Sequence, residues 1–173
     1  MKTLIVYSSQ TGFTEKYAHW LAQSLGGETL SYKEAKGKDM SYFDSYDAIV
    51  YGGWAIAGKI HKAEWFMEKI QMWKDKKLAL FCVGASPAED NEEVNKFLET
   101  ALREEERKYA EVFYCPGGLD YDKMPLASKF AMKAFTAMAK RKDPKMGEMV
   151  SKSYDISDPK YLDPIVNYLE KER

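Results

Sequence analysis

Short, uninterrupted apolar runs recur along this chain, separated by longer polar or amphipathic stretches. The four strong runs and one weaker run are Leu4–Tyr7, Ala48–Tyr51, Leu78–Val83, Val112–Cys115 and, weaker, Glu28–Tyr32. The strong runs do not alternate apolar with polar positions, a pattern typical of strands that are covered on both faces. We therefore expect these runs to be the strands of a buried, mainly parallel sheet.

The stretches between the runs place apolar residues at helical spacing. Within Thr14–Leu25, the residues Tyr17, Ala18 and Leu21 share one face, and two glycines end the pattern. Similar faces predict helices over Lys62–Trp73, over Asn91–Tyr109, over about 125–141 and from about Pro159. Alternating strands and helices predict an α/β fold with a doubly wound parallel sheet, helices on both faces and right-handed crossovers.

No internal repeat or low-complexity linker interrupts this alternation. The simplest expectation is one domain over residues 1–173, with an extra helical insertion at about 120–145 before the C-terminal helix. In such sheets, ligands bind beyond the carboxyl ends of the strands, where the strand order reverses.

The loop after the first run carries the strongest functional signal. It consists of Ser9, Gln10, Thr11, Gly12, Phe13 and Thr14. The N–H groups and hydroxyls of such a strand-to-helix turn meet in front of a helix N-terminus, where partial positive charge favours a phosphate. Because the loop lacks a Gly-Lys-Ser/Thr ending, a phosphate monoester that stays bound fits better than a nucleotide that is hydrolysed. The alternative is an ordinary polar turn in which Ser9 or Thr11 caps the helix.

Two further segments follow strands at the same predicted edge. Gly52–His61 is too rich in glycine for a helix and too apolar for a plain surface turn, whereas Gly84–Asn91 is small and turn-forming. Together they could hold a flat ring with polar edges while the first loop holds its phosphate. The alternative is that Trp54 is half-buried packing and that the glycines form simple turns.

Composition narrows the choice of function class. Hydrophobic residues make up 45% of the chain and charged residues 31%, as in soluble globular domains, and no stretch approaches the ~20 apolar residues of a membrane span. The chain begins directly with a strand, so we expect no signal peptide and a cytoplasmic location. The net charge of −1 does not favour nucleic acid as a partner. Cys82 and Cys115 lie within apolar runs and are expected to be buried free thiols rather than metal ligands.

In this order of elements, Ser9-x-Thr11-Gly12-x-Thr14 after the first strand resembles the FMN phosphate loop of flavodoxins. The resemblance follows essentially the whole chain, and it implies a five-stranded sheet of order 2-1-3-4-5 and a redox protein that transfers electrons through bound FMN. It implies that residues 9–14 bind the phosphate. The residues that it implies beside the flavin ring are Gly53, Trp54, Ala55, Ile56, Ala57, Gly58 and Lys59, and then Gly84, Ala85, Ser86, Pro87 and Asn91.

A narrower resemblance is to the flavodoxin-domain branch that includes the menaquinone-dependent protoporphyrinogen IX dehydrogenases. The chain shares a Gly-x-x-His element at Gly58–His61, a Gly-Gly-Leu-x-Tyr element at Gly117–Tyr121 and an added basic helix at about 125–141. This resemblance implies that a porphyrinogen and a quinone are the redox partners. The alternative partners are a redox protein or another small electron donor or acceptor. The chain departs from the branch in its acidic residues 89–93, where well-studied members have a long basic stretch. A flavin-free binding module is the alternative from a different class.

Within this interpretation, bound FMN carries out the redox chemistry. Gly58 is the candidate for a peptide that changes its hydrogen bond to flavin N5, since glycine permits the required backbone conformations. Glu89 or Asp90, if near the ring, would disfavour an anionic reduced flavin and lower the potential. His61 is the single candidate for a proton or hydrogen-bond donor, and its alternative interpretation is a helix cap or surface residue.

The stretch of about 125–141 has apolar residues around most of its circumference. Between residues 123 and 145 the chain carries seven basic residues and one acid, Asp143. One interpretation is a docking surface for an anionic amphiphile, an acidic partner or a membrane surface. The other is a cover for the ring-side edge of the sheet, or a dimer contact.

Overall fold

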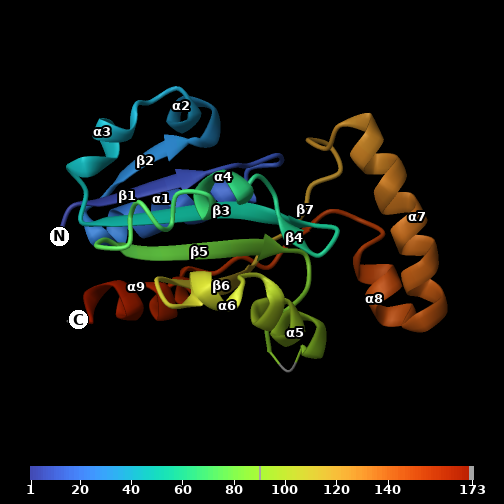
Figure 1. Cartoon of the computed structure of the whole chain (residues 1–173). Coiled ribbons are helices and arrows are strands. Elements are labelled where there is room, and N and C mark those ends of the chain that lie inside the picture. Colours follow the sequence, from blue (N-terminus) through green and yellow to red (C-terminus); the bar gives the residue numbers. More distant parts are fainter. Residues whose placement is uncertain (90, 172–173) are drawn as a thin grey trace.

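The computed structural model describes residues 1–89 and 91–171, and a parallel sheet lies at its centre (Figure 1). The sheet has the order β2-β1-β3-β5-β6, which in chain order of these five strands is the predicted 2-1-3-4-5. The strands are β1 (Thr3–Tyr7), β2 (Glu28–Ser31), β3 (Ala48–Ile56), β5 (Lys77–Gly84) and β6 (Ala110–Pro116). The fold class predicted from the apolar runs is therefore confirmed.

The two faces of the sheet are covered by separate cores, which explains why the central runs are apolar without alternation. Leu4 and Val6 of β1 belong to one core, whereas Ile5 between them belongs to the other. The Ile5 side is covered by α1 (Phe13–Leu25) and α9 (Asp163–Glu170). Cys82 and Cys115 are buried free thiols, as predicted.

Several predicted helices are shorter than their patterns. The pattern over Lys62–Trp73 yields only α4 (Glu64–Met67), because the following residues form successive turns that still bury Ile70 and Trp73. The pattern over Asn91–Tyr109 is divided into α5 (Glu92–Thr100) and α6 (Glu104–Arg107). The division follows from the extended backbone of Arg103, whose N–H donates to the Glu106 carboxylate at 2.8 Å. Two short helices between β2 and β3 were not predicted: α2 (Tyr32–Lys36) and α3 (Met40–Asp44).

The glycine-rich segment Gly52–His61 forms a β-hairpin, and its prediction as a loop is wrong. β3 continues to Ile56 and pairs in antiparallel fashion with β4 (Lys59–Ile60). The turn residues Ala57 and Gly58 have φ values of 48° and 74°, the pair of positive values found in two-residue hairpin turns of type I′. The antiparallel pairs Ala55–Ile60 and Ile56–Lys59 tie this segment to the end of β3.

Residues 118–155 leave the sheet and form what we call the α7–α8 arm. It contains β7 (Gly118–Leu119), α7 (Leu126–Lys142), α8 (Pro144–Met149) and β8 (Tyr154–Asp155), and the chain then returns through η1 (Pro159–Leu162) to α9. In Figure 1 the arm stands at the end of the sheet toward which the strands point. The extra helix predicted at about 125–141 is confirmed as α7, whereas α8 was not predicted.

The arm has a small core of its own. Its buried residues are Leu119, Met124, Ala139 and Val150. β7 and β8 pair with each other, so the arm begins and ends at one place beside the sheet. Within the described ranges, no helix combines the length and apolar character needed to cross a bilayer.

Candidate functional site

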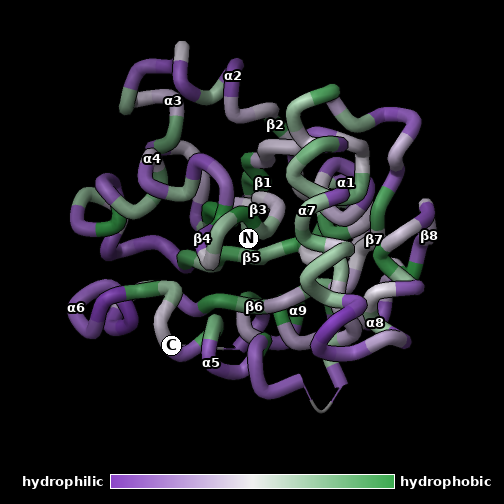
Figure 2. The backbone as a smooth tube through the Cα atoms, turned by 90° about the vertical axis from the view of Figure 1, so that its right-hand side faces the viewer, coloured by the Kyte–Doolittle hydropathy of each residue, from purple (hydrophilic) through white to green (hydrophobic). Residues whose placement is uncertain are grey.

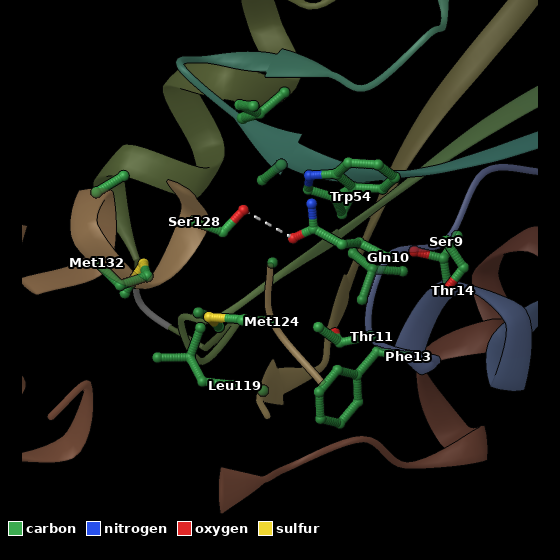
Figure 3. A pocket seen from close by; sticks show the side chains of 17 residues that line it. Ser9, Gln10, Thr11, Phe13, Thr14, Trp54, Leu119, Met124, Ser128 and Met132 are labelled. Carbon is green, nitrogen blue, oxygen red and sulfur yellow. Dashed lines mark hydrogen bonds between the residues drawn. The ribbon is translucent and has the colours of Figure 1, made fainter. Parts of the chain in front are cut away.

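A cavity of about 230 Å³ opens between the sheet edge and the α7–α8 arm (Figure 3). It lies where the sequence predicted a ligand, beyond the carboxyl ends of β1, β3 and β5. The predicted site residues that line it are Ser9, Gln10, Thr11, Phe13, Thr14, Trp54, Ala55, Ile56, Gly84 and Ala85. All three predicted segments therefore contribute to one cavity.

The first wall is the loop in front of α1. Gly12 is the N-cap residue of α1, with a φ of 100°, and no side chain caps the helix. A Cβ at Gly12 would meet nothing within 4 Å, so the need for glycine here comes from backbone conformation alone. Ser9 Oγ accepts the Gly12 N–H at 3.1 Å, and no capping side chain accepts a first-turn N–H of α1. An uncapped helix N-terminus of this kind suits an anion.

The second wall is the Trp54 ring of β3. It stacks on the His61 ring with centroids 3.5 Å apart and an interplanar angle of 20°. His61 is fixed in turn, because its Nδ1 lies 2.9 Å from Ser8 Oγ and its carbonyl accepts the Tyr51 hydroxyl at 2.9 Å. The His61 N–H donates to the Trp54 carbonyl at 2.9 Å. The hairpin thus presents a braced aromatic surface to the cavity.

His61 does not itself line the cavity. Burial lowers its pKa from the ordinary value, the neighbouring Lys62 lowers it further, and Glu64 opposes both. These effects favour the neutral imidazole. The structure supports a role for His61 in positioning Trp54, and its predicted role as a proton donor stays a prediction.

The third wall is the backbone at the end of β5, where Gly84 and Ala85 meet the cavity. A Cβ at Gly84 would lie 2.2 Å from the Tyr114 hydroxyl, so only glycine fits beside that ring. Tyr114 donates to the Ser86 carbonyl at 2.9 Å, and Tyr154 of β8 donates to the Ala85 carbonyl. Two tyrosines from different elements therefore fix this loop.

The remaining predicted residues of this loop lie away from the cavity. Asn91 caps α5 by accepting the N–H groups of Glu93 and Val94 at 3.1 and 3.2 Å, and its amide donates to the Pro87 carbonyl. Glu89 accepts the Tyr161 hydroxyl at 2.8 Å. Asp90 lies outside the described residues. The predicted ring contacts of Ser86, Pro87 and Asn91 stay predictions.

The hairpin residues and Gly12 complete the account of the predicted positions. Neither Gly53 nor the turn and strand residues Ala57, Gly58 and Lys59 line the cavity. At Gly53 a Cβ would meet Ile60 Cγ2 at 2.6 Å, which is a packing requirement. Gly12 borders an adjoining hollow of about 510 Å³ that the arm also lines.

The residues of the fourth wall were not predicted from the sequence. A cover for this edge of the sheet was, however, one of the two interpretations of the stretch that forms α7. The arm contributes Gly118, Leu119, Met124, Ser128, Ala131 and Met132. Figure 3 shows the Met124 and Met132 side chains across the cavity from Trp54. Ser128 Oγ donates to Gln10 Oε1 at 3.3 Å, which joins α7 to the first loop. The lining of the cavity is mostly apolar. Its hydroxyl and amide side chains come from the first loop and the first turn of α1 (Ser9, Gln10, Thr11 and Thr14) and from Ser128 of α7.

Across residues 1–89 and 91–171, no group of three or more His, Cys, Asp or Glu side chains is arranged to hold a metal ion.

Several solved structures have a similar chain path. One is the flavodoxin, WrbA-like protein from Agrobacterium tumefaciens, at 23% identity, with 50% of this chain and 62% of that chain covered and a TM-score of 0.42. Another is a flavoprotein in complex with FMN from Lactobacillus acidophilus NCFM, at 19% identity, covering 66% and 91%, TM-score 0.44. A third is two-electron reduced Megasphaera elsdenii flavodoxin, at 20% identity, covering 72% and 89%, TM-score 0.49. The chain thus spans less than two thirds of the first of these.

Comparison with curated proteins finds no match. The family comparison is decisive for classification, because the model described as "Flavodoxin domain" matches residues 4–145. That range includes all four walls of the cavity and most of the parallel sheet. The chain belongs to the flavodoxin domain family.

Proposed function

We propose that the protein binds FMN and transfers electrons through it. One observation carries the proposal: an uncapped helix N-terminus, rich in hydroxyls, opens onto an apolar cavity that has a braced aromatic wall. A phosphate at one end and a flat ring at the other are the two chemical groups that such a site suits.

The residues present fit the phosphate end of FMN. The first-turn N–H groups of α1 and the hydroxyls of Ser9, Thr11 and Thr14 would hold the phosphate. The loop itself contains no lysine or arginine, so binding would rely on hydrogen bonds and the helix dipole. A phosphate that is retained rather than transferred needs no more than this.

The residues present also fit the ring. Trp54 would cover one side of it, and Leu119, Met124 and Met132 offer an apolar surface across the cavity. The backbone of Gly84 and Ala85 could meet polar ring edges. When bound, FMN supplies one-electron and two-electron transfer, whereas the chain orients it and limits its contact with water. The brace of His61 and Ser8 behind Trp54 would keep the aromatic wall in place during turnover.

The experiment is flavin binding by the purified chain and by two variants of Thr11. The wild-type protein is expected to be yellow, or to become so when FMN is added, with a flavin absorption band. Thr11→Asp should lower FMN affinity at least about a hundredfold, because a carboxylate beside a phosphate loses a hydrogen bond and adds repulsion. The control is Thr11→Asn. The asparagine side chain has nearly the same shape as aspartate but no charge, so this variant should retain most of the FMN affinity. Colourless protein that FMN cannot reconstitute would indicate a flavin-free binding module instead.

A substrate dehydrogenase, with a porphyrinogen as donor and a quinone as acceptor, is the second candidate. The observation that favours it is the α7–α8 arm, which covers the cavity through Ala131, Met132 and the Ser128–Gln10 hydrogen bond. A covered site of this kind suits a small-molecule reactant better than a docked protein. Anaerobic stopped-flow mixing with protoporphyrinogen, then with a quinone, distinguishes the two. Reduction and reoxidation of the flavin at catalytic rates would support the dehydrogenase. If neither reaction occurs, the electron carrier remains the proposed function.

A further inference from the structure

The two faces of α7 differ sharply in exposure. Its inner face turns Ser128, Met132 and Thr136 toward the molecule and buries Ala139. Its outer face leaves Leu126 and Phe130, four residues apart, 74% and 70% exposed. Among the described residues, half of the large apolar side chains that are exposed lie on this one helix: Leu126, Phe130, Phe135 and Met138, against Met1, Met40, Ile56 and Met72 elsewhere. Such a concentration on one helix needs an explanation beyond chance exposure.

The same helix concentrates positive charge. Residues 123–142 contain six lysines and arginines and no acid, so the remainder of the chain has a formal net charge of −7. Lys129, Lys133 and Lys140 fall at helical spacing beside the exposed apolar stripe. Lys133 lies over the Phe130 ring, with Nζ 5.9 Å from the ring centroid. Figure 2 views the molecule from this side, with α7 in front.

Together these features describe a helix built to lie on a charged apolar boundary. Phe135 and Met138 lie further round the helix, so Leu126 and Phe130 form the outer apolar stripe. An exposed apolar stripe with lysines alongside is the arrangement by which interfacial helices bury apolar side chains in an anionic lipid surface. Long lysine stems allow the ammonium groups to reach headgroup phosphates while the apolar residues insert. A second copy of the chain fits less well, because a symmetric contact would bring two strongly positive helices together.

We propose that the outer face of α7 docks the protein onto the surface of a bilayer that contains anionic phospholipid. α7 would lie in the plane of the surface, its length of about 25 Å along the headgroups. Its inner face would remain the wall of the cavity, which places the cavity opening about one helix diameter, ~10 Å, from the lipid. The proposal does not rest on FMN, since it uses only the outer face of α7.

The test measures co-sedimentation of the full chain with large unilamellar vesicles of phosphatidylcholine alone or with 30 mol % phosphatidylglycerol, a composition chosen as roughly that of an anionic surface. We expect binding to the anionic vesicles only, weakened by added salt. The double variant Leu126→Ser/Phe130→Ser should lower the partition coefficient by at least about tenfold, because two apolar side chains no longer insert. Met72→Ser, which also removes an exposed apolar side chain, is the matched control and should bind as wild type does.

A second pair of variants tests the charge. Lys133→Gln/Lys140→Gln should lower the partition coefficient by about fivefold for each lysine removed, which corresponds to ~1 kcal/mol each. Lys33→Gln/Lys36→Gln makes the same change on the exposed side of α2 and should have no effect. Circular dichroism of each variant checks that it is folded.

Three results would overturn the proposal. One is no binding to the anionic vesicles, or binding that the α7 variants leave unchanged. Another is equal binding to poly-glutamate that survives Leu126→Ser/Phe130→Ser, which would indicate an acidic partner held by charge alone. The third is a dimer in sedimentation velocity that Phe130→Ser abolishes, since the outer face would then be an interface between two copies.

Discussion

The central sheet and the α7–α8 arm use the same residue types for different purposes. Phe81 in β5 is fully buried between two layers, whereas Phe130 in α7 is 70% exposed. The sheet is covered on both faces by large cores, but the arm has only a small buried cluster around Leu119 and Val150. The sheet therefore supplies the rigid half of the cavity, and the arm supplies a wall that less packing holds in place.

This difference bears on how the site works. Movement of α7 away from the sheet edge would open the cavity, and it would break the Ser128–Gln10 hydrogen bond to the first loop. Local opening costs least where few buried apolar contacts must be broken. The arm meets that description, and β1, β3 and β5 do not.

The sharpest test of the contrast makes one substitution in both regions. Phe81→Ala should lower the free energy of unfolding by about 3–5 kcal/mol, because it removes a fully buried ring and leaves a cavity. Phe130→Ala should change it by no more than about 0.5 kcal/mol, because the ring is already exposed to solvent. Urea unfolding followed by circular dichroism measures both. Equal losses would mean that the arm belongs to the cooperative core.

Amide hydrogen exchange compares the two regions without mutation. Amides of β5 should exchange through global unfolding, whereas those of α7 should open at a free energy lower by about 3 kcal/mol or more. The physical reason is the small buried cluster beneath α7. Exchange measured by NMR at the same pH for both elements provides the comparison, and matching protection in α7 and β5 would contradict it.

A third comparison separates the two faces of α7. Ala131→Trp places an indole in the cavity and should weaken FMN binding about tenfold or more, through an overpacking cost of about 1–3 kcal/mol. Ala134→Trp makes the same change at an exposed position outside the cavity lining and should leave FMN affinity unchanged. Fluorescence titration with FMN measures both. If both variants bind FMN as wild type does, the ring does not lie against α7.

The smallest effect concerns His61, on the sheet side of the cavity. Burial lowers its pKa in the folded chain, so between that lowered pKa and about 6.5 the unfolded chain binds more protons. The contribution of neutral His61 to the free energy of unfolding is therefore complete above about pH 6.5, and it is lost as the pH falls from there through the lowered pKa. The slope for one proton is at most about 1.4 kcal/mol per pH unit. His61→Gln should reduce the slope of the unfolding free energy against pH in urea unfolding between pH 5 and 7, and an unchanged slope would contradict the assignment.

The sheet and the first loop could be predicted because their signals are local. Uninterrupted runs such as Leu78–Val83 can be satisfied only by burial on both faces, and Gly12 stands where a helix begins after a buried strand. Helix lengths were less predictable, since a favourable face over Asn91–Tyr109 does not reveal that α5 ends at Thr100 and that the Glu106 carboxylate, by accepting the Arg103 N–H, helps to start a second helix.

The fourth wall of the cavity could not be read from the sequence in the same way. Which face of α7 meets the cavity depends on a long-range contact between Ser128 and Gln10, 118 positions apart. The apolar pattern of α7 fits a cover and a docking surface equally well, and the structure shows that its two faces differ. The hairpin at Gly52–His61 was missed because its turn needs a positive φ at Ala57, and alanine is not a residue that usually indicates a hairpin turn.

The most direct test of the central claim compares FMN with riboflavin, which has the same ring and lacks the phosphate. Isothermal titration of flavin-free protein should give tight FMN binding and riboflavin binding at least about a hundredfold weaker, because only the phosphate engages the uncapped N-terminus of α1. Thr11→Asp should remove most of that difference by weakening FMN and not riboflavin. Equal affinity for the two flavins, or no binding of either, would contradict the account.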